Sequence, residues 1–454
     1  MTAQARLDLQ TLRQQVEALL DAHDLEALDG LLTTEHPADI ADLLELLDDE
    51  ERVAVFTMLQ PEAAAEVLDE TRTETTRDIV EAMDNEQIAD LLEVLPVDDA
   101  AEVLIELGGD QAANLLALME PEEAAEVETL LTYPEDSAGR LMATNIARLR
   151  STWTAEEALN YLRRVDKEVE TIAYLYVVDS RQRLLGIVPL RELITNPPDA
   201  LIADIMVTNV ISVRVDTDQE QVARLVAQYD FFAIPVVDAD NRLLGIITHD
   251  DVIDILEDEF TEDVQRFGGS EPLEGNYLAT PVLTVARKRV GWLLVLFLTE
   301  MQTGSVMRLF ESELQQVVAL SFFIPLLIGT GGNSGSQATS TIIRALAVGE
   351  ARFEDLLHLL WHELRVGVLL GVVMWIVGYL RALTWGTTIQ LAMTVSGSLV
   401  AIVIWANLIG ALLPPLASRL KIDPAVISGP VMSTLVDATG LLIYFTLART
   451  IIGL

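Results

Sequence analysis

Residues 425–454, AVISGPVMSTLVDATGLLIYFTLARTIIGL, have the length and apolar character of a membrane-spanning helix. They place one carboxylate, Asp437, inside the apolar stretch. A lone Asp at that depth costs roughly 3 kcal/mol unless it meets water, a cation or a polar partner. The stretch therefore predicts an ion path through the membrane. The alternative is an Asp that only hydrogen-bonds a neighbouring helix.

Residues 322–346, FFIPLLIGTGGNSGSQATSTIIRAL, form a second unusual apolar stretch. Pro325 and the glycines between Gly329 and Gln337 predict a spanning helix that breaks and then resumes. Such a break must face protein or a water-filled cavity, and its free carbonyls can coordinate ions. A phosphate-binding loop is disfavoured because no Lys follows the glycines and the flanks are apolar.

Charge and hydropathy are segregated along the 454 residues, which have a mean hydropathy of +0.34 and a formal charge of -42. Residues 1–275 hold 62 acidic and 18 basic side chains, whereas residues 276–454 hold 9 acidic and 11 basic ones. One half is therefore a polyanion and the other a membrane domain. The acidic half should repel nucleic acid and attract cations.

The chain contains no cysteine, so disulfides and thiolate metal sites are excluded. Its first residues, MTAQARLDLQTLRQQ, have no apolar signal-peptide core. The acidic half is therefore expected to stay in the cytosol.

Residues 1–132 contain a helical repeat. IADLLE begins at residues 40 and 88, and AAEVLD, AAEVLI and AAEVET begin at residues 64, 100 and 124. The spacing gives one short helix and its turn in about 12 residues, with Pro37, Pro61, Pro96 and Pro121 near helix starts. Paired helices of this kind predict an acidic all-α superhelix.

Residues 133–256 contain a second repeat with a different period. YVVDSRQRLLGIVPLREL from Tyr176 aligns without gaps with PVVDADNRLLGIITHDDV from Pro235, at an offset of 59 residues. Each copy predicts a strand, an amphipathic helix, a strand, a tight turn, a strand and a helix. The pattern resembles a tandem pair of CBS domains, which implies an α/β regulatory domain that often senses nucleotides.

Residues 257–289 are expected to form a connecting, or plug, helix. Acidic residues crowd its first turns, and Arg287, Lys288 and Arg289 precede the first span. The segment is either a linker with a basic membrane flank or a lever that carries a regulatory signal to the pore.

Residues 290–454 predict a bundle of five transmembrane helices, near 290–309, 317–347, 361–384, 389–416 and 426–453. Most basic residues around these spans fall on the side of the acidic half, which supports its cytosolic location. Glu300, a second intramembrane carboxylate, either faces a cavity or extends along an interface. His358 and His362 are four residues apart but do not match the HExxH zinc pattern.

The order of an acidic helical repeat, paired CBS-like copies, an acidic connecting helix and five spans resembles the MgtE family of magnesium channels and transporters. The motifs GTGGNSGSQ and STLVDATGLLIYF carry the resemblance in the membrane half. It implies a non-enzymatic homodimer in the plasma membrane that encloses a pore and imports Mg²⁺. The pore positions that it implies are Asp437, which would hold hydrated Mg²⁺, with Gly329, Gly332, Asn333, Thr341 and Ser433.

The resemblance also implies that cytosolic Mg²⁺ closes the pore by bridging acids of the N-terminal and CBS regions. The implied regulatory residues are Glu66, Asp98, Glu102, Asp218, Glu220, Asp230, Asp251, Asp254, Glu259, Glu262 and Asp263. Some members bind ATP between the CBS domains, and Tyr174, Arg191 and Phe231 match that site, while Glu192 replaces an Asp that contacts the ribose.

Three departures from the family pattern concern the pore. Ser336 and Gly429 stand where Asn is expected, and Glu300 stands where no carboxylate is expected. One competing hypothesis is a CBS-regulated transporter of another divalent metal such as Co²⁺ or Mn²⁺. The other is a membrane-bound Mg²⁺ sensor that transports nothing.

Overall fold

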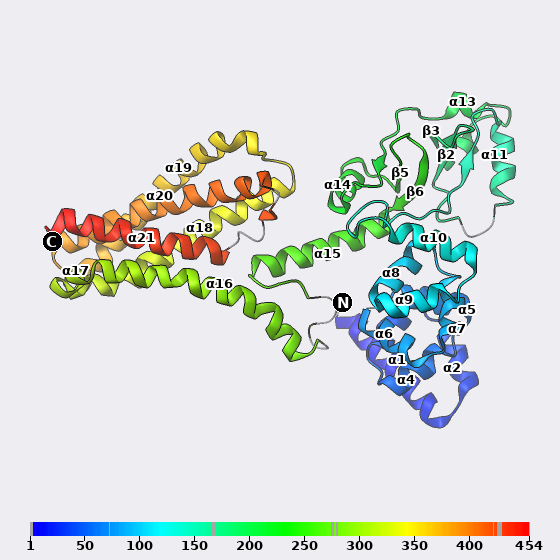
Figure 1. Ribbon diagram of the computed structural model, residues 1–454, viewed down its shortest axis with the longest axis horizontal. Helices are drawn as coiled ribbons and strands as arrows, with labels where there is room; N and C mark the ends of the chain where they lie inside the picture. The colour runs from blue at the N-terminus through cyan, green and yellow to red at the C-terminus, as the bar shows by residue number, and fades with distance from the viewer. Residues whose placement is uncertain are drawn as a thin grey trace. The chain divides into compact units, whose positions relative to one another are not determined.

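The computed structural model describes residues 3–71, 73–165, 169–273, 277, 280–420, 422–424 and 429–453 (Figure 1). The chain divides into two compact units. The first unit is mainly Met1–Glu259, and the second holds Phe260–Leu273 and Tyr277–Leu454.

The first unit begins with helices that follow the 12-residue repeat. They are α1 (Ala3–Ala22), α2 (Leu25–Leu32), α3 (Pro37–Leu44), α4 (Asp49–Phe56), α5 (Pro61–Asp69), α6 (Thr73–Ala82), α7 (Asn85–Leu92), α8 (Val97–Leu107), α9 (Gly109–Leu116) and α10 (Pro121–Leu131). Proline occupies the first turn of α3, α5 and α10, where no amide donor is needed, and Pro96 is the N-cap of α8. Helices two places apart pack together, as α3, α5, α7 and α9 do, around one apolar core.

The two repeats that follow have the predicted order of elements. The first comprises β1 (Arg148–Leu149), α11 (Ala155–Leu162), β2 (Tyr174–Val178), β3 (Leu184–Pro189) and α12 (Leu190–Thr195). After α13 (Ile202–Ile205), the second comprises β4 (Val213–Arg214), α14 (Gln219–Tyr229), β5 (Ala233–Val237), β6 (Leu243–Thr248) and α15 (His249–Phe267). Each sheet pairs its first two strands in parallel and its last two in antiparallel.

The two copies contact each other through their hairpin turns. The Leu184 amide donates to the Asn241 carbonyl at 2.9 Å, and the Leu243 amide donates to the Gln182 carbonyl at 2.9 Å. Gln182 and Asn241 have φ values of 61° and 62°, the left-handed conformation that these tight turns require. The reciprocal bonds make the turns equivalent, as the alignment of the repeats predicts.

Helix α15 is longer than the sequence indicated. It runs without interruption across the predicted boundary between residues 256 and 257, and the division between the two units falls inside it, after Glu259. Near its end, Arg266 donates from Nη1 to Asp423 Oδ2 at 2.7 Å, and both residues belong to the second unit. The last helix of the second CBS copy and the first part of the expected connecting helix are therefore one element.

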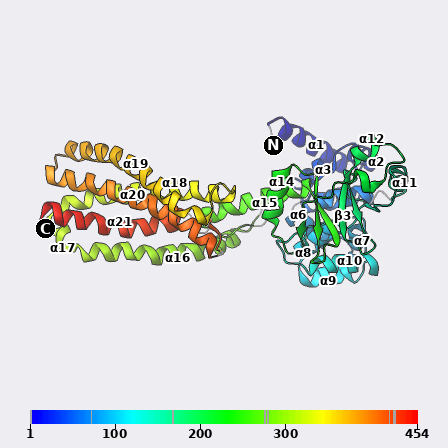
Figure 2. The same ribbon diagram turned by 90° about the horizontal axis from the view of Figure 1, so that it is seen from above.

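The second unit is helical. It contains α16 (Val282–Leu309), α17 (Glu311–Gln316), the 3₁₀ helices η1 (Val318–Phe323) and η2 (Phe353–Asp355), α18 (Ile324–Ala347), α19 (Leu356–Thr384), α20 (Ile389–Arg419) and α21 (Gly429–Ile452). Helix α20 packs against α18, α19 and α21, and α16 packs along α21 (Figure 2). Within the described residues, four helical segments are long and apolar enough to cross a membrane: Val318–Ala347, Phe353–Thr384, Ile389–Arg419 and Val431–Ile452. Helix α16, the expected first span, is not among these four.

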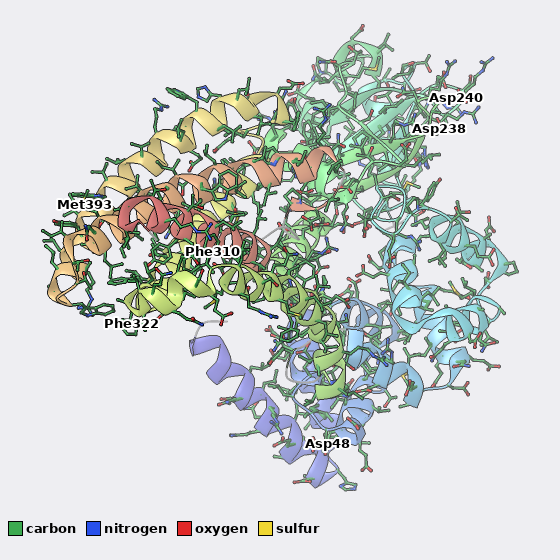
Figure 3. All side chains as sticks on the ribbon, turned by 60° about the vertical axis from the view of Figure 1, so that its left-hand side comes forward. Asp48, Asp238, Asp240, Phe310, Phe322 and Met393 are labelled. Atoms are coloured by element: carbon green, nitrogen blue, oxygen red, sulfur yellow. The ribbon has the colours of Figure 1, made fainter. Side chains whose placement is uncertain are left out.

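Both the core and much of the exposed surface of the second unit are apolar. Phe310 is buried and stacks on Phe445 with ring centroids 4.8 Å apart. Phe322 and Met393 are exposed at the periphery, whereas the labelled acids of the first unit, Asp48 and Asp240, lie at its outer surface (Figure 3). An apolar exterior fits a lipid environment, and an acidic exterior fits water.

The predicted break at the glycine run is wrong, because α18 passes through GTGGNSGSQ as a continuous helix. Pro325 lies in its first turn and follows η1, so it begins the helix instead of breaking it. The glycines serve close packing. A Cβ on Gly331 would lie 2.6 Å from Ile402 Cγ2, and one on Gly335 would overlap Met432 Cε. Small residues let membrane helices approach each other in this way.

Candidate functional site

Helix α18 exposes a polar stripe. Gly329, Asn333, Gln337 and Thr341 are all exposed and recur every four residues, so they lie on one face of the helix. Most residues between them, including Gly332 and Ser334, are buried. A polar face on a membrane-spanning helix has to meet protein or water instead of lipid.

Helix α21 brings two more of the expected pore residues beside this stripe. Gly332 contacts α21 so closely that a Cβ there would lie 3.2 Å from Ser433 Oγ. Asp437 follows Ser433 by one helical turn and is half-buried. A Cβ on Gly329, in contrast, would meet nothing within 4 Å. Asp437 has no hydrogen-bond partner among the described residues, which disfavours the alternative of a purely structural Asp.

Glu300 is the carboxylate that acts electrostatically on Asp437. It is exposed on α16, the helix that packs along α21. Two neighbouring carboxylates repel each other unless a cation lies near them. Glu300 therefore belongs with the candidate ion site.

A second acidic group lies in the first unit, where α5, α8 and α15 approach each other. Asp98 of α8 is repelled chiefly by Asp251 of α15, and Asp69 of α5 is repelled by both Asp251 and Asp254. Burial, followed by repulsion from Asp251, raises the pKa of Glu170 to about 7. The pKa of Asp69 is raised to about 6, mainly by burial and next by repulsion from acidic neighbours. Burial and repulsion raise the pKa of Asp98 in the same way.

This set, Asp69, Asp98, Asp99, Glu170, Asp251 and Asp254, is named here the acidic interface. Asp98 Oδ1 is buried and has no hydrogen-bond partner, whereas Asp251 Oδ2 accepts bonds from the Thr248 amide at 2.9 Å and hydroxyl at 2.7 Å. Oxygen ligands and net negative charge suit Mg²⁺ or Ca²⁺. No three acidic or His side chains in the described part of the chain converge on one point at metal-ligand distance. The arrangement is thus a repulsive cluster instead of a closed metal cage.

The structure does not bring all the expected regulatory residues together. Asp218 caps α14 by accepting from the Glu220 amide at 3.1 Å, and Glu220 pairs with Arg224. Asp230 lies at the opposite end of the same helix, in a left-handed conformation. An 11-residue helix is about 16 Å long, so Asp218 and Asp230 cannot share one ion within the chain.

The remaining expected acids lie outside the acidic interface or at its edge. Glu66 and Glu102 are exposed, about one turn from Asp69 and Asp98 on their own helices. Glu259 accepts from Gln219 Nε2 at 2.8 Å. Glu262 forms an ion pair with Arg266, and Asp263 follows it in the part of α15 that belongs to the second unit.

Sequence reasoning missed Asp69, Asp99 and Glu170. Asp69 ends the repeat copy AAEVLD, and Asp99 adjoins Asp98. Glu170 lies in the five residues that only the first CBS copy contains, so comparing the two copies could have singled it out.

The expected nucleotide residues are partly adjacent. Tyr174 pairs with Pro189 across the sheet, which places it beside Arg191 and Glu192 at the start of α12. Its aromatic neighbour is Phe232, at 6.2 Å between ring centroids, whereas Phe231 stacks on Tyr229 at 5.4 Å. The exposed ring of Phe232, from the second copy, therefore lies beside Tyr174.

Comparison with known proteins covers all these regions. The MgtE profile, described as a divalent cation transporter, matches residues 324–447, the MgtE intracellular N domain matches residues 35–136, and CBS domains match residues 138–198 and 202–258. The crystal structure of the cytosolic domain of the Mg²⁺ channel MgtE in complex with ATP covers 54% of this chain and 99% of its own, at 40% identity and a TM-score of 0.52. The soluble part of a magnesium transporter gives the same TM-score at 35% identity, covering 55% of this chain and 99% of its own.

Two full-length relatives extend the match into the membrane half. The magnesium transporter MgtE of Bacillus subtilis is 36% identical over 72% of both chains. That of Thermus thermophilus is 42% identical over 96% of this chain and 98% of its own. The apolar helices cross the membrane, and the N-terminal domains are cytosolic. By its domain order and this near full-length identity, the chain belongs to the MgtE family of divalent cation transporters.

Proposed function

We propose that the protein is an Mg²⁺-selective channel that imports magnesium across the plasma membrane. The observation that carries this proposal is the close approach of Gly332 on α18, which adjoins Asn333 of the polar stripe, to Ser433 on α21, one turn before Asp437. Mg²⁺ dehydrates reluctantly, so one or two carboxylates with small polar groups that touch bound waters suit it better than a full protein cage. The inside-negative potential would supply about 2.3 kcal/mol per charge for each 100 mV.

The proposed channel is a homodimer. Asn333, Gln337 and Thr341 are exposed on a spanning helix, and lipid cannot satisfy their polar groups. A second copy related by a two-fold axis would cover this stripe with the same stripe and leave a polar channel between them. The regulatory acids on α14 that cannot share an ion within one chain could contribute to sites between two copies.

Cytosolic Mg²⁺ is proposed to close this channel by binding at the acidic interface. Two unit charges 4 Å apart interact by about 4 kcal/mol at an effective dielectric of 20, so bound cations would remove several kcal/mol of repulsion. Helix α15 carries Asp251 and Asp254 near its start and the Arg266–Asp423 bond near its end. It would therefore transmit the state of the acidic interface to the membrane helices. ATP is proposed as a further regulator, with its base against Tyr174 and Phe232.

Inside-out membrane patches test the proposal because the bath then contacts the cytosolic domains. We expect an Mg²⁺ current that falls as bath Mg²⁺ rises to several millimolar. In the double variant Asp98→Asn, Asp251→Asn, closure should need at least threefold more Mg²⁺. Asp240→Asn, which changes an exposed acid in a turn, is the matched control and should leave closure unchanged.

The same patches decide the alternative substrate. A transporter of Co²⁺ or Mn²⁺ would carry those ions at low concentration with Mg²⁺ present, whereas the proposed channel should select Mg²⁺. Larger Co²⁺ or Mn²⁺ currents than Mg²⁺ currents would contradict the proposed selectivity, and an Mg²⁺ current indifferent to cytosolic Mg²⁺ would contradict the gate.

A further inference from the structure

A buried chain of hydrogen bonds crosses three helices of the second unit. Ser334 Oγ of α18 donates to Asn407 Oδ1 of α20 at 2.5 Å, and Asn407 Nδ2 donates to Glu363 Oε2 of α19 at 3.3 Å. The three residues are 9%, 2% and 8% exposed, respectively. A buried carboxylate within a spanning helix is costly and usually has a functional reason.

The bonds lie where the helices approach most closely. One turn after Asn407, a Cβ on Gly410 would lie 2.7 Å from the Gly335 carbonyl oxygen. On the other side, one turn after Glu363, a Cβ on Gly367 would lie 3.1 Å from Ile404 Cα and 3.5 Å from Asn407 Cβ. Asn407 is therefore enclosed between α18 and α19.

Glu363 fixes the direction of the whole chain. An ionised carboxylate only accepts hydrogen bonds, so the Asn407 amide must turn its NH₂ group toward Glu363 and its carbonyl toward Ser334. The Ser334 hydroxyl must then donate to that carbonyl. Beyond Asn407, the other Glu363 oxygen lies 3.4 Å from Nδ1 of the exposed His362. Removing the carboxylate would leave the amide free to turn over and lose the bond from Ser334.

Ser334 directly follows Asn333 of the polar stripe. Successive residues of an α-helix are turned by about 100°, so the bond that holds Ser334 toward α20 also sets where Gly329 and Asn333 face. We propose that Glu363 is a positioning residue for the ion path: acting through Asn407 and Ser334, it fixes the rotation of α18 that presents the polar stripe. This inference rests on the proposed channel function and adds a residue that does not itself contact the ion.

The test measures Mg²⁺-over-K⁺ permeability ratios and Mg²⁺ uptake rates of the full chain in proteoliposomes. Glu363→Leu and Ser334→Ala should each lower the permeability ratio at least fivefold. The double variant should lower it no further than Glu363→Leu alone, because both changes break the same chain. Glu363→Gln should keep more than half of the native ratio, since its side-chain oxygen can accept the Asn407 bond.

Ser396→Ala is the matched control. Ser396 is a buried serine on α20 whose hydroxyl donates to the Ala392 carbonyl of its own helix at 2.6 Å, and its loss should leave the ratio unchanged. Additive effects of Glu363→Leu and Ser334→Ala would overturn the proposal. Glu363→Gln as damaging as Glu363→Leu would also overturn it, because the charge itself would then act on the ion. If Glu363→Leu fails to fold, a native ratio in Ser334→Ala is sufficient to overturn it.

Failure of this inference is distinguishable from failure of the proposed function. Asp437→Asn should abolish Mg²⁺ uptake whatever the role of Glu363. Mg²⁺ uptake that survives in Asp437→Asn would contradict the channel assignment. If Asp437→Asn loses uptake but Ser334→Ala keeps the native permeability ratio, only the positioning role of Glu363 is contradicted.

Discussion

At the scale of single residues, the candidate ion site depends on where polar groups stand within apolar helices. Asp437 lies one turn beyond Ser433, which packs against Gly332, and both Ser433 and Asp437 are half-buried. Glu300 adds a second negative charge. Charge at this density attracts a dication more strongly than a monovalent ion, since the Coulomb energy doubles with the charge.

Glu300→Gln tests the contribution of this second charge. With one carboxylate fewer beside Asp437, we expect the Mg²⁺ concentration for half-maximal uptake to rise about threefold to tenfold, with a smaller change in maximal rate. Initial uptake rates over a range of external Mg²⁺ give both parameters. Glu311→Gln, an exposed acid bonded to Gln315 within α17, is the control. An unchanged or lower half-saturation concentration in Glu300→Gln would exclude Glu300 from the ion path.

At the scale of elements, α18 shows what sequence can and cannot predict. The repeat periods gave the short helices of residues 1–132 and the strand and helix order of both CBS copies, because local spacing determines these elements. The glycine run was interpreted as a break because glycine is a poor helix former in water. In the membrane, contacts with Ile402, Val436 and Met432 outweigh that preference, and such long-range contacts leave no local signal.

Gly410→Ala tests this packing. Its Cβ would meet the Gly335 carbonyl at 2.7 Å, and backbone cannot move aside easily, so we expect a loss of about 1–3 kcal/mol of stability. A Cβ on Gly397 of the same helix would meet nothing within 4 Å, so Gly397→Ala should be neutral or stabilising. Thermal unfolding of the purified full chain in detergent compares the two variants. Equal midpoints would show that α18 and α20 do not pack as closely as described.

At the scale of the whole molecule, α15 is the element whose extent differed most from expectation. The predicted domain boundary followed a change of composition, but the helix continues across it. Val252 and Ile255 are buried before the boundary, and Arg266 bonds to Asp423 after it. The candidate regulatory set was predicted in part. The predicted residues Asp98, Asp251 and Asp254 belong to the acidic interface, whereas Glu170 joins it from a distant loop that no local pattern marks.

The pH dependence of the cytosolic half tests the acidic interface without Mg²⁺. The folded-state pKa of Glu170 is raised to about 7 and that of Asp69 to about 6, so the folded state binds protons more tightly than the unfolded state. Stability is therefore lost as the pH rises through 6 to 7 and is regained on acidification. We expect hydrogen exchange in α5 and α8 of the full chain to slow between pH 8 and pH 6, after correction for the intrinsic rate. Millimolar Mg²⁺ at pH 8 should produce the same protection, and faster corrected exchange at pH 6 would contradict the account.

Uptake of Mg²⁺ into proteoliposomes with an inside-negative potential is the most direct test of the central claim. The native chain and the control Glu311→Gln should take up Mg²⁺, and Asp437→Asn, which keeps the shape of the side chain but removes its charge, should lower the rate at least a hundredfold. That result would establish Asp437 as the charge on which the ion path depends. Native uptake by Asp437→Asn would contradict the assignment of the path to α18 and α21.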